Sequence, residues 1–209
     1  MKKFSDSEIE KLNSQLRGVA PSEIIQWVLA SSNKPVVTTN FRPYEAAILH
    51  ACTQVDKSMK IIWCDTGYNT LPTYKHAQFL IDHLDLKVKL YTPKETAAYR
   101  DAFFKGIPGV DSPDHDEFTR QVKLEPFQRA MTEQNPDVWF TNLRKGQTNF
   151  RDSIDILSYS KDGLLKVSPF YHWSDEKLDE YLREHKLPNE FKYFDPTKVL
   201  DNRECGLHA

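Results

Sequence analysis

The residues that decide the fold are 34–91, KPVVTTNFRPYEAAILHACTQVDKSMKIIWCDTGYNTLPTYKHAQFLIDHLDLKVKLY. Three β-branched or apolar runs in this stretch predict short strands at 36–39, 60–64 and 87–91. Between them, apolar residues at helical spacing predict helices around 46–55 and over 72–84. A strand–helix–strand–helix–strand order is typical of right-handed β/α units, so we expect a mostly parallel sheet flanked by helices.

The pattern extends in both directions from this stretch. Residues 5–30 predict two amphipathic helices, the second opened by Pro21. Downstream, the sequence predicts a helix at 93–106, a loop at 108–116, a helix at 122–133, a strand at 137–141, a hairpin over 154–167 and a helix from Trp173 to His185. Residues 188–209 have little periodicity. We therefore expect one α/β domain at 1–187, with N-terminal helices in 1–30, and an irregular C-terminal tail at 188–209.

Composition excludes several classes of protein. The 209 residues are 39% hydrophobic and 12% aromatic, which is enough for a core and excludes wholesale disorder. Lys and Arg number 28 against 30 Asp and Glu, so a chain-wide basic footprint for nucleic acid is absent. No stretch approaches the roughly 20 apolar residues of a membrane span, and the first residues lack the apolar run of a secretory signal. We expect a cytoplasmic protein without a nucleic-acid or membrane partner.

The three cysteines, Cys52, Cys64 and Cys205, are far apart. An all-cysteine zinc or iron–sulfur site needs four thiolates, so one chain cannot supply it, and we expect no metal site. Cys52 and Cys64 lie in apolar runs and are expected to be buried. Cys205 lies in a polar run between Arg203 and His208, whose charges would stabilise a reactive thiolate. These residues alone leave open whether Cys205 is a working thiol or an incidental one.

Three polar turns follow expected strands, at the sheet edge where open α/β folds bind ligands. The first turn leads into a helix, whose N–H groups favour an anion, and it contains Thr38, Thr39, Asn40, Phe41 and Arg42. It lacks the glycines and the Lys-Ser/Thr of a Walker loop, so an ATPase of that class is not supported.

The other two turns each allow two interpretations. Residues 142–151 combine cations with amide and hydroxyl donors, as an anion clamp or a solvated basic loop would: Arg144, Lys145, Gln147, Thr148 and Arg151. Lys123 and Arg129 add to this positive surface or are simply exposed. The remaining turn, Asp65, Thr66 and Gly67, suits hydrogen bonds to a nucleoside or a plain turn.

The C-terminal run Arg203-Glu204-Cys205-Gly206-Leu207-His208 resembles the Glu-Cys-Gly-Leu-His signature of the thioredoxin-dependent phosphoadenylyl-sulfate (PAPS) reductases. Further blocks of that family occur in the same order: Asp65-Thr66-Gly67-Tyr68 with Pro72-Thr73-Tyr74, Val122–Pro126 with Arg129-Ala130, Leu143-Arg144 with Gln147-Thr148 and Arg151, and Lys166-Val167 with Pro169 and Trp173. The resemblance runs from about residue 22 to the end of the sequence.

The resemblance implies an adenine nucleotide α-hydrolase-like fold, related to the ATP pyrophosphatases. It implies reduction of PAPS to sulfite and adenosine 3′,5′-bisphosphate in assimilatory sulfate reduction, which serves cysteine biosynthesis. Cys205 matches the nucleophile, which would form a Cys-S-sulfonate that thioredoxin or glutaredoxin releases as sulfite. No bound cofactor or iron–sulfur cluster is expected. Family members often pair, so a homodimer is a further expectation.

By position in the motifs, the resemblance also assigns substrate-binding residues. Three groups are expected, a degenerate phosphate loop, a nucleoside side and a set around the phosphosulfate: Thr38, Thr39, Asn40, Phe41 and Arg42; Asp65, Thr66 and Gly67; Lys123, Arg144, Gln147, Thr148, Arg151, Arg203 and His208. Because Cys205 must close over the cleft and then meet a redox partner, the tail 188–209 is expected to be mobile without substrate.

The sequence departs from the family pattern at three places. Phe41 is followed by Arg42-Pro43, where the family has glycine, so substrate is expected to approach differently or to contact Arg42. A Gly-Tyr-x-Ser-x-Gly-Asp block that normally precedes the cysteine is missing. Only Lys198 and Arg203 supply the positive charge that family tails carry.

Three alternatives remain beside PAPS reduction. A cluster-free enzyme could accept adenylyl sulfate (APS), although the APS branch binds its cluster through extra cysteines that this chain lacks. A non-catalytic sulfonucleotide-binding protein is a second alternative, and Cys205→Ser would leave its binding unchanged. An ATP-using relative is the third, but it needs a Ser-Gly-Gly-x-Asp-Ser loop, which residues 39–44 do not form.

Overall fold

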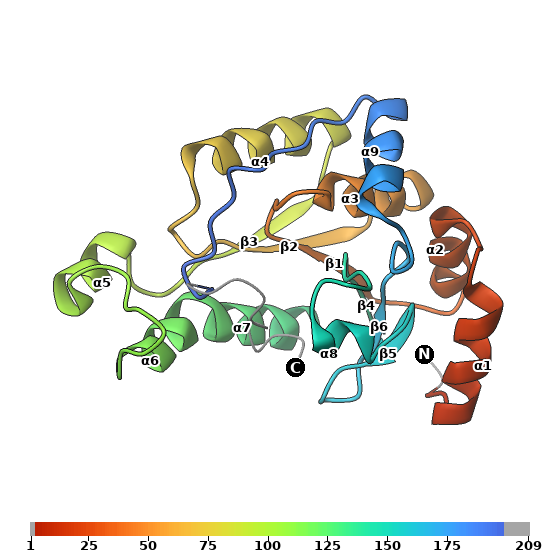
Figure 1. The fold of residues 1–209 in the computed structure, drawn as a ribbon, viewed down its shortest axis with the longest axis horizontal. Helices are drawn as coiled ribbons and strands as arrows, with labels where there is room; N and C mark the ends of the chain where they lie inside the picture. The colour runs from red at the N-terminus through yellow and green to blue at the C-terminus, as the bar shows by residue number, and fades with distance from the viewer. Residues whose placement is uncertain (1–2, 199–209) are drawn as a thin grey trace.

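The structure is a computed structural model and describes residues 3–198. Within that range one sheet has the strand order β3-β2-β1-β4-β6-β5 (Figure 1). Its strands are β1 (Pro35–Thr39), β2 (Lys60–Cys64), β3 (Val88–Tyr91), β4 (Val138–Phe140), β5 (Leu157–Tyr159) and β6 (Leu165–Val167). Neighbours are parallel except the β5–β6 hairpin. The predicted parallel sheet and hairpin are confirmed.

The helices between the strands also follow the predicted order. They are α1 (Asp6–Leu16), α2 (Pro21–Leu29), α3 (Glu45–Val55), α4 (Leu71–Leu84), α5 (Ala97–Phe104), α6 (His115–Thr119), the π-helical turn η1 (Arg120–Leu124), α7 (Glu125–Gln134), α8 (Asn149–Asp152) and α9 (Asp175–Glu184). No helix in the described part of the chain is long and apolar enough to cross a membrane.

Three local differences from the predicted elements have identifiable causes. The helix expected at 93–106 begins only at Ala97, because the Thr96 hydroxyl caps it by accepting from the Tyr99 N–H at 3.2 Å. Helical structure resumes at His115, earlier than expected, and continues through η1 into α7. The loop expected after β4 contains α8, which Thr148 caps.

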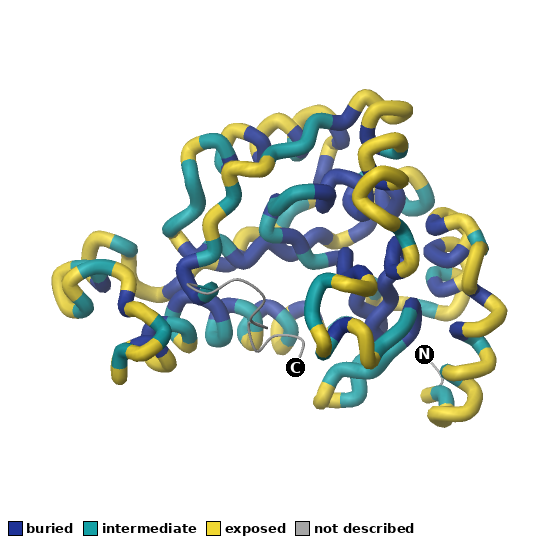
Figure 2. Tube along the Cα trace, in the orientation of Figure 1, coloured by how far each residue is buried: buried dark blue, intermediate teal, exposed yellow. Residues whose placement is uncertain are grey.

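The sheet separates two apolar clusters of unequal size. Val37, Ile61 and Phe140 face α2, α3, α4 and α9 and belong to the larger cluster. Ile62 and Trp139, which alternate with them along the strands, face α7 and belong to the smaller one. Figure 2 shows this buried band running through the strands, with exposed residues concentrated on the outer helices. Packing of the two clusters against both faces of the sheet fixes the positions of the carboxyl ends of β1, β2 and β4.

Residues 188–198, here called the strap, leave α9, run beside α4 and reach the carboxyl ends of the strands (Figure 1). The Tyr44 N–H donates to Asn189 Oδ1 at 2.8 Å. The hydroxyls of Thr70 and Thr73 donate to the Lys192 carbonyl at 2.5 and 3.3 Å. The strap is thus the first half of the predicted tail. The rest of that tail, with Cys205, lies outside the described residues.

Candidate active site

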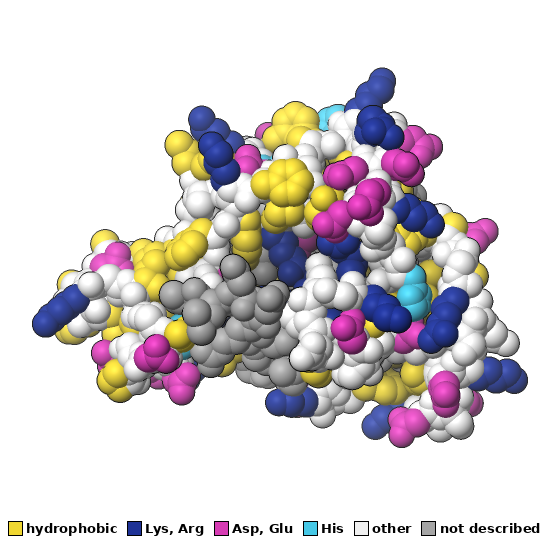
Figure 3. Space-filling model, in the orientation of Figure 1, with side chains coloured by type: hydrophobic (Ala, Val, Ile, Leu, Met, Phe, Trp, Pro, Cys, Tyr) yellow, Lys and Arg dark blue, Asp and Glu magenta, His cyan; other side chains and the backbone are white. Residues whose placement is uncertain are grey.

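A cavity, here called the cleft, opens at the carboxyl ends of β1, β2 and β4, beside the strand where the sheet order reverses. Figure 3 shows this face hollowed near its centre, with Lys and Arg side chains visible inside the hollow. The floor is largely apolar: Ile62, Cys64, Phe127 and Trp139. The walls are polar and charged: Thr38, Thr39, Asn40, Arg42, Glu45, Lys123, Thr141, Asn142, Arg151, Asp195 and Lys198.

The β1–α3 turn supplies one wall of the cleft. Thr38, Thr39, Asn40 and Arg42, all predicted as site residues, line the cleft. Phe41, predicted with them, is fully buried on the other side of the turn, where its ring meets Trp63 edge-on at 4.9 Å between centroids. Phe41 has a φ of 53°, in the left-handed region that non-glycine residues seldom adopt. The Phe41 ring therefore anchors the turn in the core and does not line the cleft.

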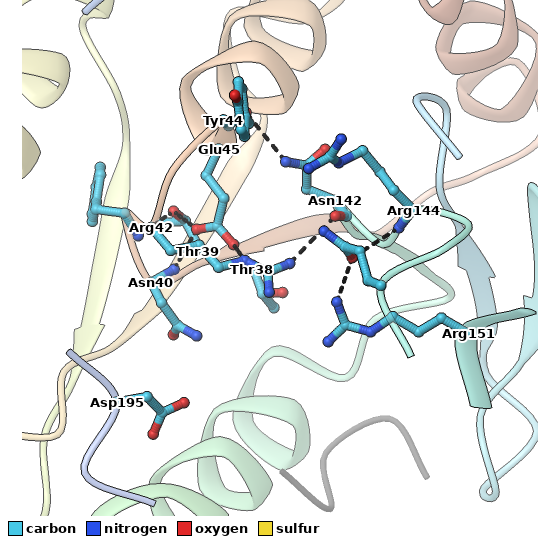
Figure 4. Close-up of polar contacts among 12 residues, drawn as sticks. Thr38, Thr39, Asn40, Arg42, Tyr44, Glu45, Asn142, Arg144, Arg151 and Asp195 are labelled. Carbon is cyan, nitrogen blue, oxygen red and sulfur yellow. Dashed lines mark hydrogen bonds and ion pairs between the residues drawn. The ribbon is translucent and has the colours of Figure 1, made fainter. Parts of the chain in front are cut away.

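Glu45, at the start of α3, is a cleft residue that sequence reasoning missed. Its Oε2 accepts from the Thr39 hydroxyl and from the Asn40 N–H, both at 2.7 Å. Its Oε1 accepts from Arg42 Nε at 2.8 Å. Arg42 also donates through Nη2 to the Asn142 carbonyl at 3.3 Å, which ties this wall to the end of β4. Figure 4 shows Glu45 pointing into the turn between Thr39 and Arg42. Arg42, at the position where the sequence departs from the family that it resembles, is thus held by Glu45.

The segment after β4 brings Arg151 to the opposite wall. Arg151 is buried in α8, and its Nη1 donates to Gln147 Oε1. Thr148 caps α8 by accepting from the Arg151 N–H at 3.2 Å. Of the predicted anion clamp, Arg151 therefore reaches the cleft, whereas Gln147 and Thr148 position it. This wall is cationic and lies in a largely buried setting, where a charge interacts strongly with an anion.

Arg144 lies behind the cleft wall and is not one of its lining residues. It is buried and ion-paired with Asp175 at the start of α9. Its guanidinium lies 5.0 Å from the ring centroid of Tyr44, over the face of that ring. Arg144 therefore connects α9 to the β1–α3 turn and supports the cleft wall from behind.

Lys123 enters the cleft from the π-helical turn η1. The wider turn inserts one extra residue into the helix, a feature frequent at functional sites. The Lys123 ammonium is buried, ion-paired with Asp195 of the strap, and donates to the Thr197 hydroxyl at 3.2 Å. Burial alone would raise the pKa of Asp195, but the charge of Lys123 and the hydrogen bonds from Lys123 and Thr197 hold that pKa below its ordinary value. The strap carboxylate is therefore ionised and occupies Lys123.

The Asp65-Thr66-Gly67 turn after β2 is organised by its own hydrogen bonds. One Asp65 oxygen accepts from the Gly67 N–H at 2.9 Å, and the Tyr74 hydroxyl reaches both carboxylate oxygens at 3.0 Å. Burial, with Asp65 nearby, raises the pKa of Tyr74 to about 12, so the phenol remains a donor. Gly67 has a φ of 81°, which suits glycine. The three residues are not among those that line the cleft.

The two cysteines within the described range are both buried, as predicted. Cys64 lies in the cleft floor, and burial raises the pKa of its thiol to about 12. Burial also raises the pKa of Cys52, beneath α3. Neither is therefore a thiolate near neutral pH. The predicted site residues Arg203, Cys205 and His208 lie outside the described residues.

Sequence reasoning assigned no site role to six polar residues of the cleft: Glu45, Thr141, Asn142, Tyr193, Asp195 and Lys198. Asn142 Nδ2 donates to the Tyr44 carbonyl at 3.1 Å and so joins the two turns. Its position in a predicted polar turn was a usable signal. Glu45 reads as an ordinary acidic residue in a first helical turn. Asp195 lies in an aperiodic segment 72 positions from its partner Lys123, a pairing that no local pattern shows.

Comparison with known proteins places this geometry in a family. The model of the phosphoadenosine phosphosulfate reductase domain matches residues 34–194, which contain every described residue that lines the cleft except Asp195 and Lys198. A phosphoadenosine 5′-phosphosulfate reductase of Xylella fastidiosa is 30% identical over 187 residues, 87% of this chain and 76% of the relative.

Solved structures agree on the fold. The crystal structure of phosphoadenylyl-sulfate reductase from Candida auris, a phosphate complex, has a TM-score of 0.78 at 24% identity and covers 90% of each chain. An NH3-dependent NAD synthetase from Campylobacter jejuni has a TM-score of 0.55 at 14% identity, covering 85% of this chain and 73% of the other. The expected adenine nucleotide α-hydrolase-like fold is confirmed. The domain match over 34–194 and the 30% identical relative establish that the chain belongs to the phosphoadenosine phosphosulfate reductase family.

Proposed function

We propose that this chain is a phosphoadenylyl-sulfate reductase of assimilatory sulfate reduction. The observation that carries the proposal is the family match over residues 34–194, because that range contains the turns that build the cleft. The chemistry of the cleft agrees with an anionic substrate, since Lys123 and Arg151 bring buried positive charge to an apolar floor.

The proposed nucleophile is Cys205. Its thiolate attacks the sulfur of the phosphosulfate, an S–S bond forms, the S–O bond breaks, and adenosine 3′,5′-bisphosphate leaves with the bonding pair. A thiol of a reduced dithiol protein then attacks the Cys205 sulfur and releases sulfite. The second thiol of that protein resolves the mixed disulfide and restores Cys205. Sulfur gains two electrons, and one dithiol becomes a disulfide.

The residues of the cleft act on the leaving group. Charge develops on the phosphate oxygen as the S–O bond breaks, and preorganised cations stabilise it in a site of low dielectric. Arg151, held by Gln147, is one cation that we assign to this role. Lys123 is the second, once its ammonium exchanges Asp195 for the substrate. A phosphate is a good leaving group, so no general acid is required.

We assign the electrons to thioredoxin or glutaredoxin rather than to a bound cluster. The chain has three cysteines, one fewer than a Cys₄ iron–sulfur site requires. Cys52 and Cys64 are buried and protonated, which leaves Cys205 to exchange with a partner thiol. The cytoplasm, where thioredoxin and glutathione keep thiols reduced, is the compartment that fits this cycle.

Intact-protein mass spectrometry tests the proposal directly. Reduced full-length protein is mixed with PAPS or with APS, without any redox protein. We expect the mass of one added sulfonate, mapped to Cys205, absent from Cys205→Ser and retained in Cys52→Ser as the matched control, because Cys52 does not line the cleft. The nucleotide that forms the adduct faster is the substrate.

The other outcomes are equally informative. An adduct with APS alone would identify a cluster-free APS reductase. No adduct with either nucleotide, from protein with a cooperative unfolding transition, would overturn the proposed reaction. In that case unchanged nucleotide binding by Cys205→Ser would identify a non-catalytic sulfonucleotide-binding protein.

A further inference from the structure

The β1–α3 turn has the geometry of an anion site. Strand β1 ends at Thr39, and helix α3 begins at Glu45 and continues for 11 residues. N–H groups at a strand-to-helix turn, together with the helix dipole, attract phosphate in many nucleotide-binding proteins. Phe41 and Tyr44 both have positive φ, 53° and 68°, and they curl the backbone between strand and helix.

In this chain the donors of the turn are already used. The Asn40 N–H donates to Glu45 Oε2, and the Phe41 N–H donates to the Thr39 hydroxyl at 2.9 Å. The Thr39 hydroxyl in turn donates to the same Glu45 oxygen. The N–H groups of Asn40 and Phe41 are therefore satisfied, directly or through one hydroxyl, by a single carboxylate, while the Tyr44 N–H donates to Asn189 of the strap. A phosphate could bind the Asn40 N–H only by displacing the Glu45 carboxylate.

The Glu45 carboxylate is also held and neutralised. Its side chain is only 6% exposed and is paired with Arg42, whose own side chain is 22% exposed. Ala46, Ala47 and Ile48 bury the first turn of α3 in the core, so the backbone that carries Glu45 is fixed. A buried carboxylate with this many charge-assisted hydrogen bonds is not readily displaced by a soluble anion.

The carboxylate on the opposite wall is attached differently. Asp195, which pairs with Lys123, belongs to the strap rather than to a helix of the core. Detaching the strap exposes Lys123 and the Tyr44 N–H, but it leaves the Asn40 and Phe41 N–H groups bonded to Glu45 and to the Thr39 hydroxyl. The two walls therefore differ in whether an incoming anion can reach them.

We propose that Glu45 is a specificity-determining residue, which closes the β1–α3 turn to phosphate and confines anion binding to the wall of Lys123 and Arg151. The proposal rests on the proposed function, since it assigns the phosphosulfate to that wall. It implies discrimination against polyphosphates. A pyrophosphate or triphosphate group carries more negative charge than a phosphosulfate group, so the Glu45 carboxylate repels it more strongly. Nucleoside triphosphates and pyrophosphate are the excluded class.

The test measures binding of inorganic pyrophosphate to the full chain by calorimetry. Glu45→Ala removes the carboxylate, and Glu45→Gln removes its charge while keeping its shape. Glu23→Gln is the matched control, because Glu23 also lies in a first helical turn and accepts from a backbone N–H, that of Ala20 at 3.3 Å, but far from the cleft along α2. We expect pyrophosphate to bind Glu45→Ala at least tenfold more tightly than the wild type, Glu45→Gln to bind more tightly as well, and Glu23→Gln to match the wild type.

Wild-type affinity in both Glu45 variants, each with a wild-type circular dichroism spectrum, would overturn the proposal. If Glu45→Ala does not fold, Glu45→Gln decides the question. Pyrophosphate carries no sulfonate, so this readout is independent of sulfur reduction. A missing sulfonate adduct on Cys205 together with the expected pyrophosphate gain would therefore overturn the proposed function alone. An intact adduct without the gain would overturn the role of Glu45 alone.

Discussion

Replacing Lys123 by methionine tests how the strap is held. The change removes the positive charge that faces Asp195 and keeps a side chain of similar length. In the wild type the two side chains are 4% and 7% exposed. Breaking a buried pair by removing one partner costs about 3–5 kcal/mol, because it leaves an uncompensated buried charge. Asp195 lies on the strap, however, so detachment of the strap would return its carboxylate to water.

The free energy needed to detach the strap follows from its other contacts with the domain. Asn189 and the Lys192 carbonyl accept three hydrogen bonds from the domain, each worth about 1 kcal/mol net. An edge contact between Phe191 and Tyr44 adds about 1 kcal/mol. Their sum, about 4 kcal/mol, is no larger than the penalty for the unpaired carboxylate, and release also restores chain entropy. We therefore expect local detachment rather than destabilisation of the core.

Trypsin reports this detachment, because the carbonyl of Lys192 is tied to Thr70 and Thr73 in the folded protein. We expect cleavage after Lys192 to be at least tenfold faster in Lys123→Met, while the free energy of unfolding in urea falls by about 1 kcal/mol or less. The double variant Lys123→Met with Asp195→Asn should restore the wild-type cleavage rate. An unchanged cleavage rate combined with a loss of 3 kcal/mol or more would refute the reasoning.

Three further predictions concern other parts of the molecule. Iodoacetamide at pH 8 should label neither Cys52 nor Cys64 in the folded protein, since burial raises both pKa values, that of Cys64 to about 12; peptide mapping checks this. Burial, with His185 and Lys57 nearby, lowers the pKa of His50 to about 4, so its contribution to stability is complete above pH 6.5 and is lost as pH falls toward 4. Urea unfolding at pH 7.5 and pH 5 should differ by about 1 kcal/mol from this half-exposed group, and His50→Gln should remove that difference. Gln147→Ala, which releases one restraint on Arg151, should lower kcat with PAPS about tenfold and change KM less, as steady-state kinetics would show.

The sheet was predictable because each of its central strands has a recognisable local sequence pattern. Residues 36–39 and 60–64 are continuous apolar or β-branched runs, as strands covered on both faces must be. Their parallel pairing follows from the helix between them. The elements that sequence missed are short. The α8 helix has four residues and depends on its Thr148 cap, and the π-helical turn η1 is an insertion within a continuous helix. Neither segment is long enough to show a recognisable hydrophobic period.

The cations of the site were predictable, whereas the carboxylates that hold them were not. Arg42, Lys123 and Arg151 stand in sequence blocks whose chemistry suggests an anion. Asp195 lies beside none of these blocks, and Glu45 is separated from Arg42 by a proline and a left-handed residue that hide their contact. Whether a cation faces substrate or a carboxylate depends on tertiary structure, and only the three-dimensional arrangement reveals it.

The two carboxylates of the cleft explain how a cationic site is stable without substrate and still accepts one. Glu45 neutralises Arg42 from the core helix α3, so this pair is permanent. Asp195 neutralises Lys123 from the strap, so this pair can exchange. Any anion that takes Lys123 must displace Asp195, and the strap leads directly toward Cys205 along the chain. In the proposed reaction, binding of PAPS at Lys123 would therefore be coupled to movement of the strap, and that reaction needs Cys205 first at the cleft and then at a redox partner.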